Sequence, residues 1–531
     1  MPELTLQNIS PRDYQRKIYE TCKIKNCLVV LPTGIGKTLI ALMLAINRLK
    51  AFPTSKILFL APTRPLAEQH LNYFNKHLPE LFAQLDLFTG KIDSIKRQEI
   101  WQNAEIIFST PQCIANDLKN NLYDLKEVSL LVEDECHRCL KNYAYTYVVE
   151  KYKEQAFNQR ILGMTASPGV ETKTIKQISE NLGIEAIELR TRESEDVKPY
   201  LQKLEFETIK LDFPEEFDKI KKTLKIIFDK KIEELKNRKL LFGPPTKKNI
   251  LDMQSRIMRA ISSGNKHFNL LSGASAAALA LKLQHALELL ETQTLYSLQN
   301  YFYEIFNQAE KKTSKAVQTL VKSPEFNQAF IAINELLARK IENPKLSKLK
   351  EILEDTIKNN PKAKVIIFSQ FRDNVTRICK EMNSIQNINA KVFVGQAKKV
   401  VGRNQENKEE TGLSQKEQQE IIKDFSLGNI NVLCATSIGE EGLDIPEVNS
   451  VIFYEPVPSA IRKIQRAGRT ARLIKGKLII LMVKGTRDEA YHWASFQKEK
   501  KMYKAIEQIK QDLDNNSDKT NSQNKEQKTL F

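Results

Sequence analysis

A glycine-rich loop between an apolar run and a helical segment constrains the fold of this chain most strongly. The apolar run covers 27–31, and the loop after it holds two glycines and a Lys-Thr pair. In this order, backbone N–H groups and the positive end of the helix surround phosphate oxygens. The predicted phosphate loop consists of Pro32, Thr33, Gly34, Ile35, Gly36, Lys37 and Thr38.

The loop and a second, acidic segment predict a site for ATP and Mg²⁺. Lys37 would neutralise the β and γ phosphates, and the Thr38 hydroxyl would bind Mg²⁺. A predicted buried strand ends in Asp134 and Glu135. Asp134 would hold Mg²⁺, and Glu135 would orient and deprotonate the attacking water. His137 would link this site to nearby motions.

Far downstream, a basic segment carries the groups that would complete ATP hydrolysis. Arg469 and Arg472 are one helical turn apart, so both guanidinium groups can face the γ-phosphate. Gln465 would help to place the water. Because these residues follow a second predicted sheet, hydrolysis would depend on closure of two domains. Upstream of the loop, Gln15 would read the adenine edge, and Tyr14 or Arg12 would pack nearby.

The order of predicted elements is α/β, then helical, then α/β again. Strand and helix patterns alternate in two regions, which indicates two parallel sheets with crossover helices. The predicted strands are 27–32, 57–61, 106–109, 129–133 and 161–164, then 364–368, 391–394, 431–434, 450–453 and 477–483. The predicted domains are 1–197 (ATP-binding), 198–345 (helical insertion), 346–511 (second α/β domain) and 512–531 (disordered polar tail).

The amino-acid composition indicates a class of binding partner and a cellular compartment. The net charge of +17 and the pI near 9.3 favour a polyanion, which nucleic acid satisfies. Basic pairs lie along the predicted insertion at 221–222, 230–231, 247–248 and 311–312. Seven scattered cysteines suggest reduced thiols in a cytoplasmic setting. The Leu- and Ala-rich stretch 270–290 contains charged residues, so it predicts a packed helix and no membrane partner.

These motifs, in this order, resemble those of superfamily 2 helicases. The segment 61–69 looks like motif Ia, 109–112 like motif Ib, 165–168 like motif III, 365–372 like motif IV and 435–446 like motif V. The resemblance implies that Thr165 and Ser167 couple ATP state to domain movement, and that Asp444 contacts the ribose. Small hydroxyl groups and amides suit phosphates, so sequence-independent strand contacts are expected. The candidates are Thr63, Arg64, Thr89, Gly90, Thr110, Ser369 and Thr436.

Three further segments are similar to archaeal Hef and the Fanconi anaemia M translocases. They are 142–145, 453–462 and 485–491. The resemblance implies two RecA-like domains with a thumb-like DNA-gripping insertion, and ATP-driven remodelling of forks and junctions in repair. It also implies a cytoplasmic, nucleoid-associated protein of archaeal type. Many Hef proteins continue into an XPF-type nuclease, whose acidic signature is missing here, so any such nuclease would be a separate partner.

The last residues suggest another partner, the sliding clamp PCNA. Gln527, Leu530 and Phe531 match a shortened clamp-binding peptide, and a random polar tail end is the competing interpretation. Two alternatives to the DNA motor also stay open. One is an RNA-directed relative, because RNA sensors and Dicer share this motor. The other is an ATP-switched scaffold that recruits a separate nuclease to branched DNA.

Overall fold

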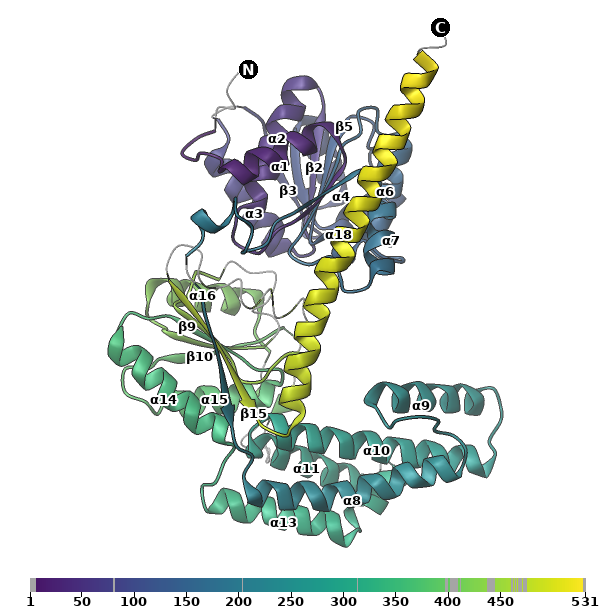
Figure 1. Ribbon diagram of the computed structural model, residues 1–531, viewed down its shortest axis with the longest axis vertical. Coiled ribbons are helices and arrows are strands. Elements are labelled where there is room, and N and C mark those ends of the chain that lie inside the picture. Colours follow the sequence, from purple (N-terminus) through teal and green to yellow (C-terminus); the bar gives the residue numbers. More distant parts are fainter. Residues whose placement is uncertain are drawn as a thin grey trace.

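The computed structural model contains two sheet domains, a helical bundle and one long carboxy-terminal helix (Figure 1). It describes residues 6–79, 82–202, 204–312, 314–396, 400–401, 409–410, 412–436, 445–459, 462, 464, 466, 470 and 475–528.

Domain 1 is built on a seven-stranded sheet in which every strand pairing is parallel. The strand order is β3-β4-β2-β5-β6-β1-β7. The strands are β1 (Cys27–Val30), β2 (Lys56–Leu60), β3 (Leu85–Phe88), β4 (Ile106–Ser109), β5 (Val128–Asp134), β6 (Ile161–Thr165) and β7 (Ala186–Leu189). The central strands are buried from end to end, which is typical of parallel sheets covered on both faces.

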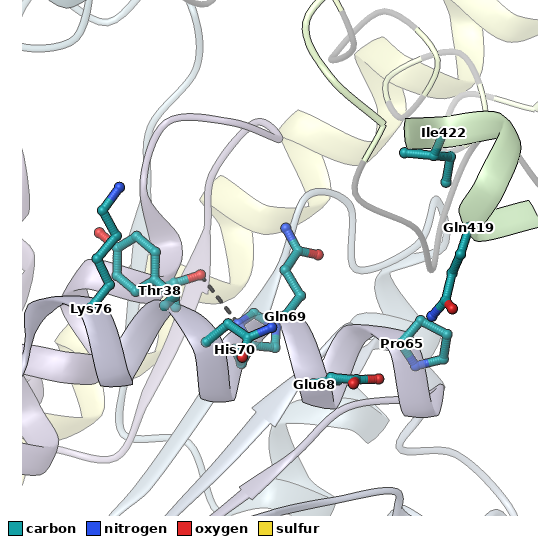
Figure 2. Close-up of a pocket in the computed structure, with 10 residues that line it drawn as sticks. Thr38, Pro65, Glu68, Gln69, His70, Lys76, Gln419 and Ile422 are labelled. Carbon is teal, nitrogen blue, oxygen red and sulfur yellow. Dashed lines mark hydrogen bonds between the residues drawn. The ribbon is translucent and has the colours of Figure 1, made fainter. Parts of the chain in front are cut away.

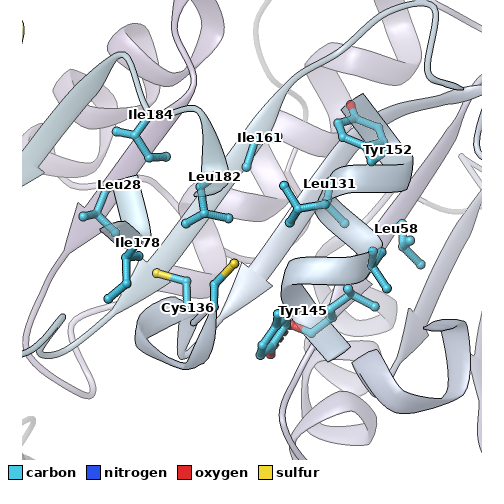
Figure 3. Close-up of a cluster of buried hydrophobic side chains, with 14 of the residues drawn as sticks. Leu28, Leu58, Leu131, Cys136, Tyr145, Tyr152, Ile161, Ile178, Leu182 and Ile184 are labelled. Atoms are coloured by element: carbon cyan, nitrogen blue, oxygen red, sulfur yellow. Dashed lines mark hydrogen bonds between the residues drawn. The ribbon is translucent and has the colours of Figure 1, made fainter. Parts of the chain in front are cut away.

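Helices cover both faces of this sheet. One face packs on α1 (Asp13–Ile24), α2 (Lys37–Ala51) and α3 (Arg64–His77). The other packs on α4 (Ser94–Asn103), α5 (Pro111–Lys119), α6 (Ala144–Gln155) and α7 (Thr172–Leu182). Figure 3 shows part of this second core, where Leu131 of β5 lies among side chains from α6 and α7. The short 3₁₀ turns η1 (Cys136–Arg138) and η2 (Lys198–Tyr200) complete the domain.

Domain 2 carries a second parallel sheet, with the strand order β10-β13-β9-β14-β15-β8. Its strands are β8 (Leu204–Leu211), β9 (Val365–Phe368), β10 (Ala390–Phe393), β13 (Val432–Ala435), β14 (Ser450–Phe453) and β15 (Gly476–Val483). Its helices are α14 (Pro344–Asn359), α15 (Arg372–Met382) and α16 (Gln415–Leu427), and β11 (Val400–Val401) pairs antiparallel with β12 (Glu409–Glu410). The two predicted α/β regions therefore form two parallel sheets.

Strand β8 differs from the prediction, which placed 198–345 in a helical insertion. β8 pairs with β15 over its full length, so this segment belongs to the sheet of domain 2. It is an edge strand with much of its length exposed, and its sequence lacks the continuous apolar run of a central strand. The chain therefore enters domain 2, leaves it through the bundle and then returns.

The helical bundle forms a unit with its own apolar core between β8 and α14. Its helices are α8 (Glu215–Asn237), α9 (Lys247–Ser262), α10 (Phe268–Thr292), α11 (Leu295–Glu310), α12 (Lys315–Val321) and α13 (Pro324–Ala338). The Leu- and Ala-rich stretch lies in α10, which is mostly buried in this core. Among the described residues, no helix combines the length and apolar character needed to cross a membrane.

Helix α18 (Arg487–Lys528) starts at domain 2 and runs along domain 1 (Figure 1). Met502, Ala505, Ile506 and Ile509 of this helix are buried in the core that α4 to α7 share. The helix also continues to Lys528, where the sequence predicted a disordered tail from residue 512 onward. Extending a helix that is already anchored costs much less than nucleating one, which accounts for this difference. Leu530 and Phe531 lie outside the described residues.

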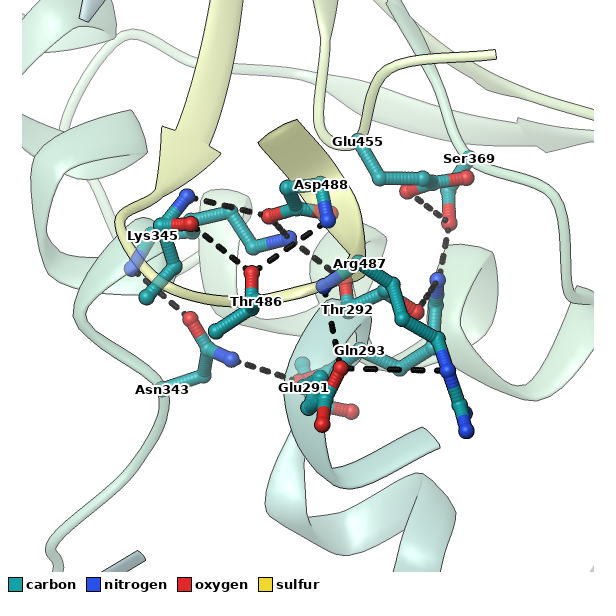
Figure 4. Close-up of polar contacts among 12 residues, drawn as sticks. Glu291, Thr292, Gln293, Asn343, Lys345, Ser369, Glu455, Thr486, Arg487 and Asp488 are labelled. Atoms are coloured by element: carbon teal, nitrogen blue, oxygen red, sulfur yellow. Dashed lines mark hydrogen bonds and ion pairs between the residues drawn. The ribbon is translucent and has the colours of Figure 1, made fainter. Parts of the chain in front are cut away.

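A buried polar network joins the bundle to domain 2 and to the start of α18 (Figure 4). Lys345 of α14 and Asp488 of α18 form an ion pair of 2.9 Å in which both side chains are fully buried. Lys345 also donates to the Thr292 carbonyl at the end of α10, at 2.6 Å. Because isolated charges are costly in an apolar interior, the pair requires all three elements to stay in place.

A second set of contacts extends this network to the end of strand β9. The hydroxyl of Ser369, just after β9, lies 3.2 Å from the Gln293 amide oxygen and 3.1 Å from the Glu455 carboxylate. Asn374 of α15 donates to Ser369 at 2.8 Å and accepts from the Thr294 backbone at 3.1 Å. The loop between α10 and α11 is therefore held directly against the sheet of domain 2.

We expect Lys345→Met to lower the free energy of unfolding by about 3–5 kcal/mol, because it leaves the Asp488 carboxylate buried without its partner. Lys348→Met is the matched control on the same helix, since Lys348 pairs with Glu351 at the surface and its loss should cost about 0–1 kcal/mol. Equilibrium urea unfolding of both variants measures these changes in the free energy of unfolding. Equal losses for the two substitutions would contradict the role given to the buried pair.

Candidate nucleotide and nucleic-acid site

The predicted ATP residues meet at one edge of the domain 1 sheet. The phosphate loop follows β1, Asp134 ends β5, and Thr165 ends β6. These three strands are neighbours in the sheet, and all point the same way. Ligands of open parallel sheets bind outside the carboxyl ends of the strands, so this edge is the expected site for a nucleotide.

The phosphate loop adopts a conformation that depends on its glycines. Gly34 has φ of 83° and Gly36 has φ of 84°, in the left-handed region that disfavours other residues. A Cβ atom at Gly36 would also lie only 2.3 Å from the Gln15 amide nitrogen. Helix α2 begins at Lys37, whose ammonium donates to the Leu31 carbonyl at 3.4 Å. The loop thus places the amino-terminal end of α2 at the carboxyl edge of the sheet.

Residues that precede β1 hold the phosphate loop in place through hydrogen bonds. The Gln15 side-chain amide donates to the carbonyls of Ile35 and Gly36, at 3.3 and 3.2 Å, and accepts from the Arg12 backbone at 2.9 Å. The predicted adenine-reading group is therefore bonded to the loop and buried in this structure. The Arg12 guanidinium lies 5.1 Å from the centre of the Tyr200 ring, a neighbour that the sequence did not reveal.

His70, which the sequence analysis missed, lies between Thr38 and Asp134 and contacts both. The Thr38 hydroxyl lies 3.3 Å from His70 Nδ1 (Figure 2). The Asp134 carboxylate lies 2.9 Å from His70 Nε2. A hydroxyl and a carboxylate oxygen are the hard ligands that Mg²⁺ prefers. The chemical type of these donor atoms therefore fits the predicted ion, which would neutralise charge on the phosphates of a bound nucleotide.

Glu135 lies beside the two residues predicted to couple ATP state to movement. Thr165 donates to the Glu135 carboxylate at 3.3 Å and accepts from the Ser167 backbone at 3.1 Å. His137 Nδ1 lies 3.3 Å from the same carboxylate and 3.1 Å from the Thr165 hydroxyl. Glu135 also has φ of 50°, an unusual value for a residue with a side chain and one that often marks functional sites.

The charge state of Glu135 fits a group that acts as a carboxylate. Burial raises the pKa of Glu135, but the hydrogen bond to His137 and the charge of Lys37 outweigh burial and lower the pKa to about 2. The neighbouring Glu133 behaves in the opposite way. It is fully buried, its two carboxyl oxygens have no hydrogen-bond partner in the described structure, and burial raises its pKa well above the usual range.

The predicted residues from domain 2 are only partly described. Gln465, Arg469, Arg472 and Asp444 lie outside the described residues. Their neighbour Arg466 is buried, with its guanidinium 4.8 Å from the Phe368 ring and 5.5 Å from the Phe453 ring. Thr470 donates to the Val448 carbonyl at 2.6 Å. These contacts attach the arginine-bearing segment to the domain 2 sheet.

The predicted strand contacts of domain 1 gather on the other half of the same sheet edge. Thr63 follows β2, Thr89 and Gly90 follow β3, and Thr110 follows β4. These three strands are adjacent in the sheet. Arg64 is the first residue of α3, and Gly90 is exposed. Thr436 follows β13 of domain 2 and is largely buried.

Ser369 is a correction to the predicted nucleic-acid contacts. Its side chain is fully buried, and its hydroxyl is bonded to Gln293, Glu455 and Asn374. A strand phosphate has no access to this hydroxyl. The motif IV serine therefore ties the bundle to domain 2, a role that depends on contacts with a segment distant in the sequence.

A cavity of about 460 Å³ lies between the domains beside the phosphate loop (Figure 2). One wall is formed by Thr38 of α2 together with His70 and other residues of α3. The other wall is formed by Gln419 and Ile422 of α16 in domain 2. Helix α3 therefore borders the predicted metal ligands, the predicted strand contacts and the second domain. Movement between the domains would change the shape of this cavity.

Comparisons with known proteins agree with this arrangement. The DEAD/DEAH box helicase family matches residues 12–175, and the helicase conserved C-terminal domain matches 344–474. Residues 216–342 match a helical bundle described for a candidate ATP-dependent RNA helicase. These three matches correspond to domain 1 without β7, to domain 2 without β8 and β15, and to the bundle.

Two relatives and one solved structure cover nearly the whole chain. A Methanocaldococcus jannaschii protein named as a candidate ATP-dependent RNA helicase, MJ1505, is 36% identical over 96% of this chain, which covers 62% of that protein. The ATP-dependent DNA helicase mph1 of Neurospora crassa is 32% identical over 92% of this chain, which covers 42% of it. The chain thus spans about half the length of these relatives.

The solved structure is the helicase domain of Pyrococcus furiosus Hef. It is 41% identical to this chain, with a TM-score of 0.68, and the match covers 91% of this chain and 98% of that one. The match in fold and sequence extends over 91% of this chain. The chain belongs to the superfamily 2 helicase family that includes Hef and the Fanconi anaemia M proteins.

Proposed function

We propose that this chain is an ATP-dependent DNA helicase or translocase that remodels branched DNA, as in the repair of stalled forks. The observation that carries the proposal is that the predicted nucleotide residues and the predicted strand contacts occupy two halves of one edge of the domain 1 sheet. The predicted ATP and coupling residues lie at the carboxyl ends of β1, β5 and β6, and strand-contact candidates follow the adjacent β2, β4 and β3. A nucleotide and a nucleic-acid strand bound at this edge would share the same rigid support.

The chemistry expected of each group follows from its position. Lys37 would bind phosphate oxygens, Thr38 and Asp134 would hold Mg²⁺, and Glu135 would accept a proton from the attacking water. Arg469 and Arg472 would approach from domain 2 and stabilise charge on the γ-phosphate, with Gln465 placing the water. Asp444 would contact the ribose.

Two other functions stay in competition with the DNA motor. An RNA-directed ATPase is favoured by the name of the archaeal relative and by the description of the matched helical bundle. DNA is favoured by the Fanconi anaemia M and Hef likeness and by the names of the fungal relatives. An ATP-switched scaffold that recruits a separate XPF-type nuclease would use the same site with slow turnover.

PCNA is a further proposed partner, through Gln527, Leu530 and Phe531. Apolar residues at the end of an otherwise polar tail favour a docking role. Calorimetry with a peptide of the final residues measures this directly, and no heat of binding to PCNA would end the idea.

We expect forked DNA to stimulate ATP hydrolysis more than linear duplex, single strands or duplex RNA. Lys37→Ala should reduce the stimulated turnover by about 100-fold or more, because it removes a charged group that would stabilise the transferred phosphate. A steady-state phosphate-release assay with each nucleic acid measures both effects. Stimulation by duplex RNA alone would move the chain to RNA-directed ATPases, and no stimulation by any nucleic acid would favour the scaffold.

Only three lysines of the predicted basic pairs in the bundle have no acidic partner among the described residues. Lys221, Lys222, Lys230, Lys231 and Lys247 of the predicted basic pairs form ion pairs with acidic residues. No ion pair among the described residues involves Lys248, Lys311 or Lys312, and all three are exposed. We therefore propose these three as the phosphate contacts of the bundle.

Replacing Lys248, Lys311 and Lys312 with alanine should weaken binding to forked DNA and flatten its salt dependence. Each lost phosphate contact lowers the slope of log K against log salt by about 0.9. Fluorescence anisotropy over a salt series measures the slope. Lys222→Ala is the matched control, because Lys222 already pairs with Asp218, and its slope should equal that of the wild type. A triple variant with the wild-type slope would remove these lysines from the DNA contact.

A further inference from the structure

His70 bridges the two groups that would hold Mg²⁺, although none of the sequence motifs assigns it a role. It lies on α3 with most of its surface buried, and the centre of its ring is 4.4 Å from the centre of the Phe59 ring. Its two ring nitrogens face different partners, the Thr38 hydroxyl and the Asp134 carboxylate. Packing alone would not require both nitrogens to be used.

The Asp134 carboxylate fixes the direction of one hydrogen bond, and in a neutral ring that bond fixes the direction of the other. A carboxylate only accepts, so His70 Nε2 donates its proton to Asp134. In the neutral ring Nδ1 is then an acceptor, and the Thr38 hydroxyl donates to it. The lone pairs of the Thr38 oxygen are thereby left for a cation. The second carboxylate oxygen of Asp134 is likewise not used by His70.

We propose that His70 is a positioning residue that orients the Thr38 hydroxyl and the Asp134 carboxylate for binding Mg²⁺. The proposal rests on the proposed use of ATP. Partners that hold metal ligands in place through hydrogen bonds typically contribute 10- to 100-fold to metal affinity. Because α3 also begins at Arg64, next to Thr63, His70 connects the metal ligands to the helix that carries predicted strand contacts.

The test compares substitutions that separate hydrogen bonding from packing. His70→Phe keeps a ring against Phe59 but removes both nitrogens, and His70→Gln keeps a donor toward Asp134 while removing the imidazole acceptor for Thr38. His77→Phe is the matched control. His77 lies two turns further along α3, is also buried, packs on Tyr73 and contacts the Gln7 carbonyl at 3.0 Å, away from the metal ligands.

The readout is binding of a fluorescent ADP to the full chain during a Mg²⁺ titration, with no turnover required. We expect the Mg²⁺ midpoint to rise by about 10- to 100-fold in His70→Phe and by less in His70→Gln, and to stay unchanged in His77→Phe. Binding of the same nucleotide in EDTA should be equal in all four proteins, which shows that the fold and the phosphate loop are intact.

Two results would overturn the inference while leaving the proposed function in place. One is a wild-type Mg²⁺ midpoint in His70→Phe. The other is an equal shift in His77→Phe, which would assign the effect to packing of α3. If the wild-type chain itself bound no fluorescent ADP with Mg²⁺, the proposed use of ATP would fail, and the inference would fail with it.

Discussion

The buried ion pair between Lys345 and Asp488 is the interaction on which the arrangement of this molecule depends. Both side chains are fully buried, and the pair joins α14 of domain 2, the end of α10 in the bundle and the start of α18. Around it, the loop between α10 and α11 contacts Ser369, just after β9, and Asn374 of α15. Separating these elements would expose the two charges to solvent or leave each one buried without its partner. The bundle and domain 2 should therefore behave as one body. Any ATP-driven movement of domain 2 would then carry the bundle with it.

Helix α18 gives the two sheet domains a second connection besides the chain between β7 and β8. Its first turns lie in the polar network of domain 2, and its middle turns are buried in the core of domain 1. Relative motion of the domains must therefore either pivot on this helix or detach its apolar face. The cavity between α3 and α16 lies on the path of such motion. The predicted metal ligands, the predicted strand contacts and the second domain all border α3. Closure of the domains would therefore act on the bound nucleotide and on the bound strand through this one helix.

The sequence predicted the central strands to within about two residues, because buried parallel strands are continuous apolar runs. Within the two parallel sheets, the three strands it missed, β3, β7 and β8, are all at sheet edges, where the strand is at most partly buried. The phosphate loop and the acidic motif were recognisable because their residues are contiguous. His70 and Tyr200 act through contacts between distant segments, so no local pattern marks them. Ser369 was assigned to DNA because its burial depends on Gln293, which lies in another part of the chain.

The central claim, that the bundle and domain 2 move as one body relative to domain 1, is tested most directly by single-molecule fluorescence distances. All seven natural cysteines are buried, so cysteines introduced at exposed Asn265 in the bundle, Asn360 in domain 2 and Lys91 in domain 1 allow pairwise labelling. With a non-hydrolysable ATP analogue, Mg²⁺ and forked DNA, we expect the 91–360 distance to change and the 265–360 distance to stay constant. A change in the 265–360 distance as large as the change between domains would contradict the claim.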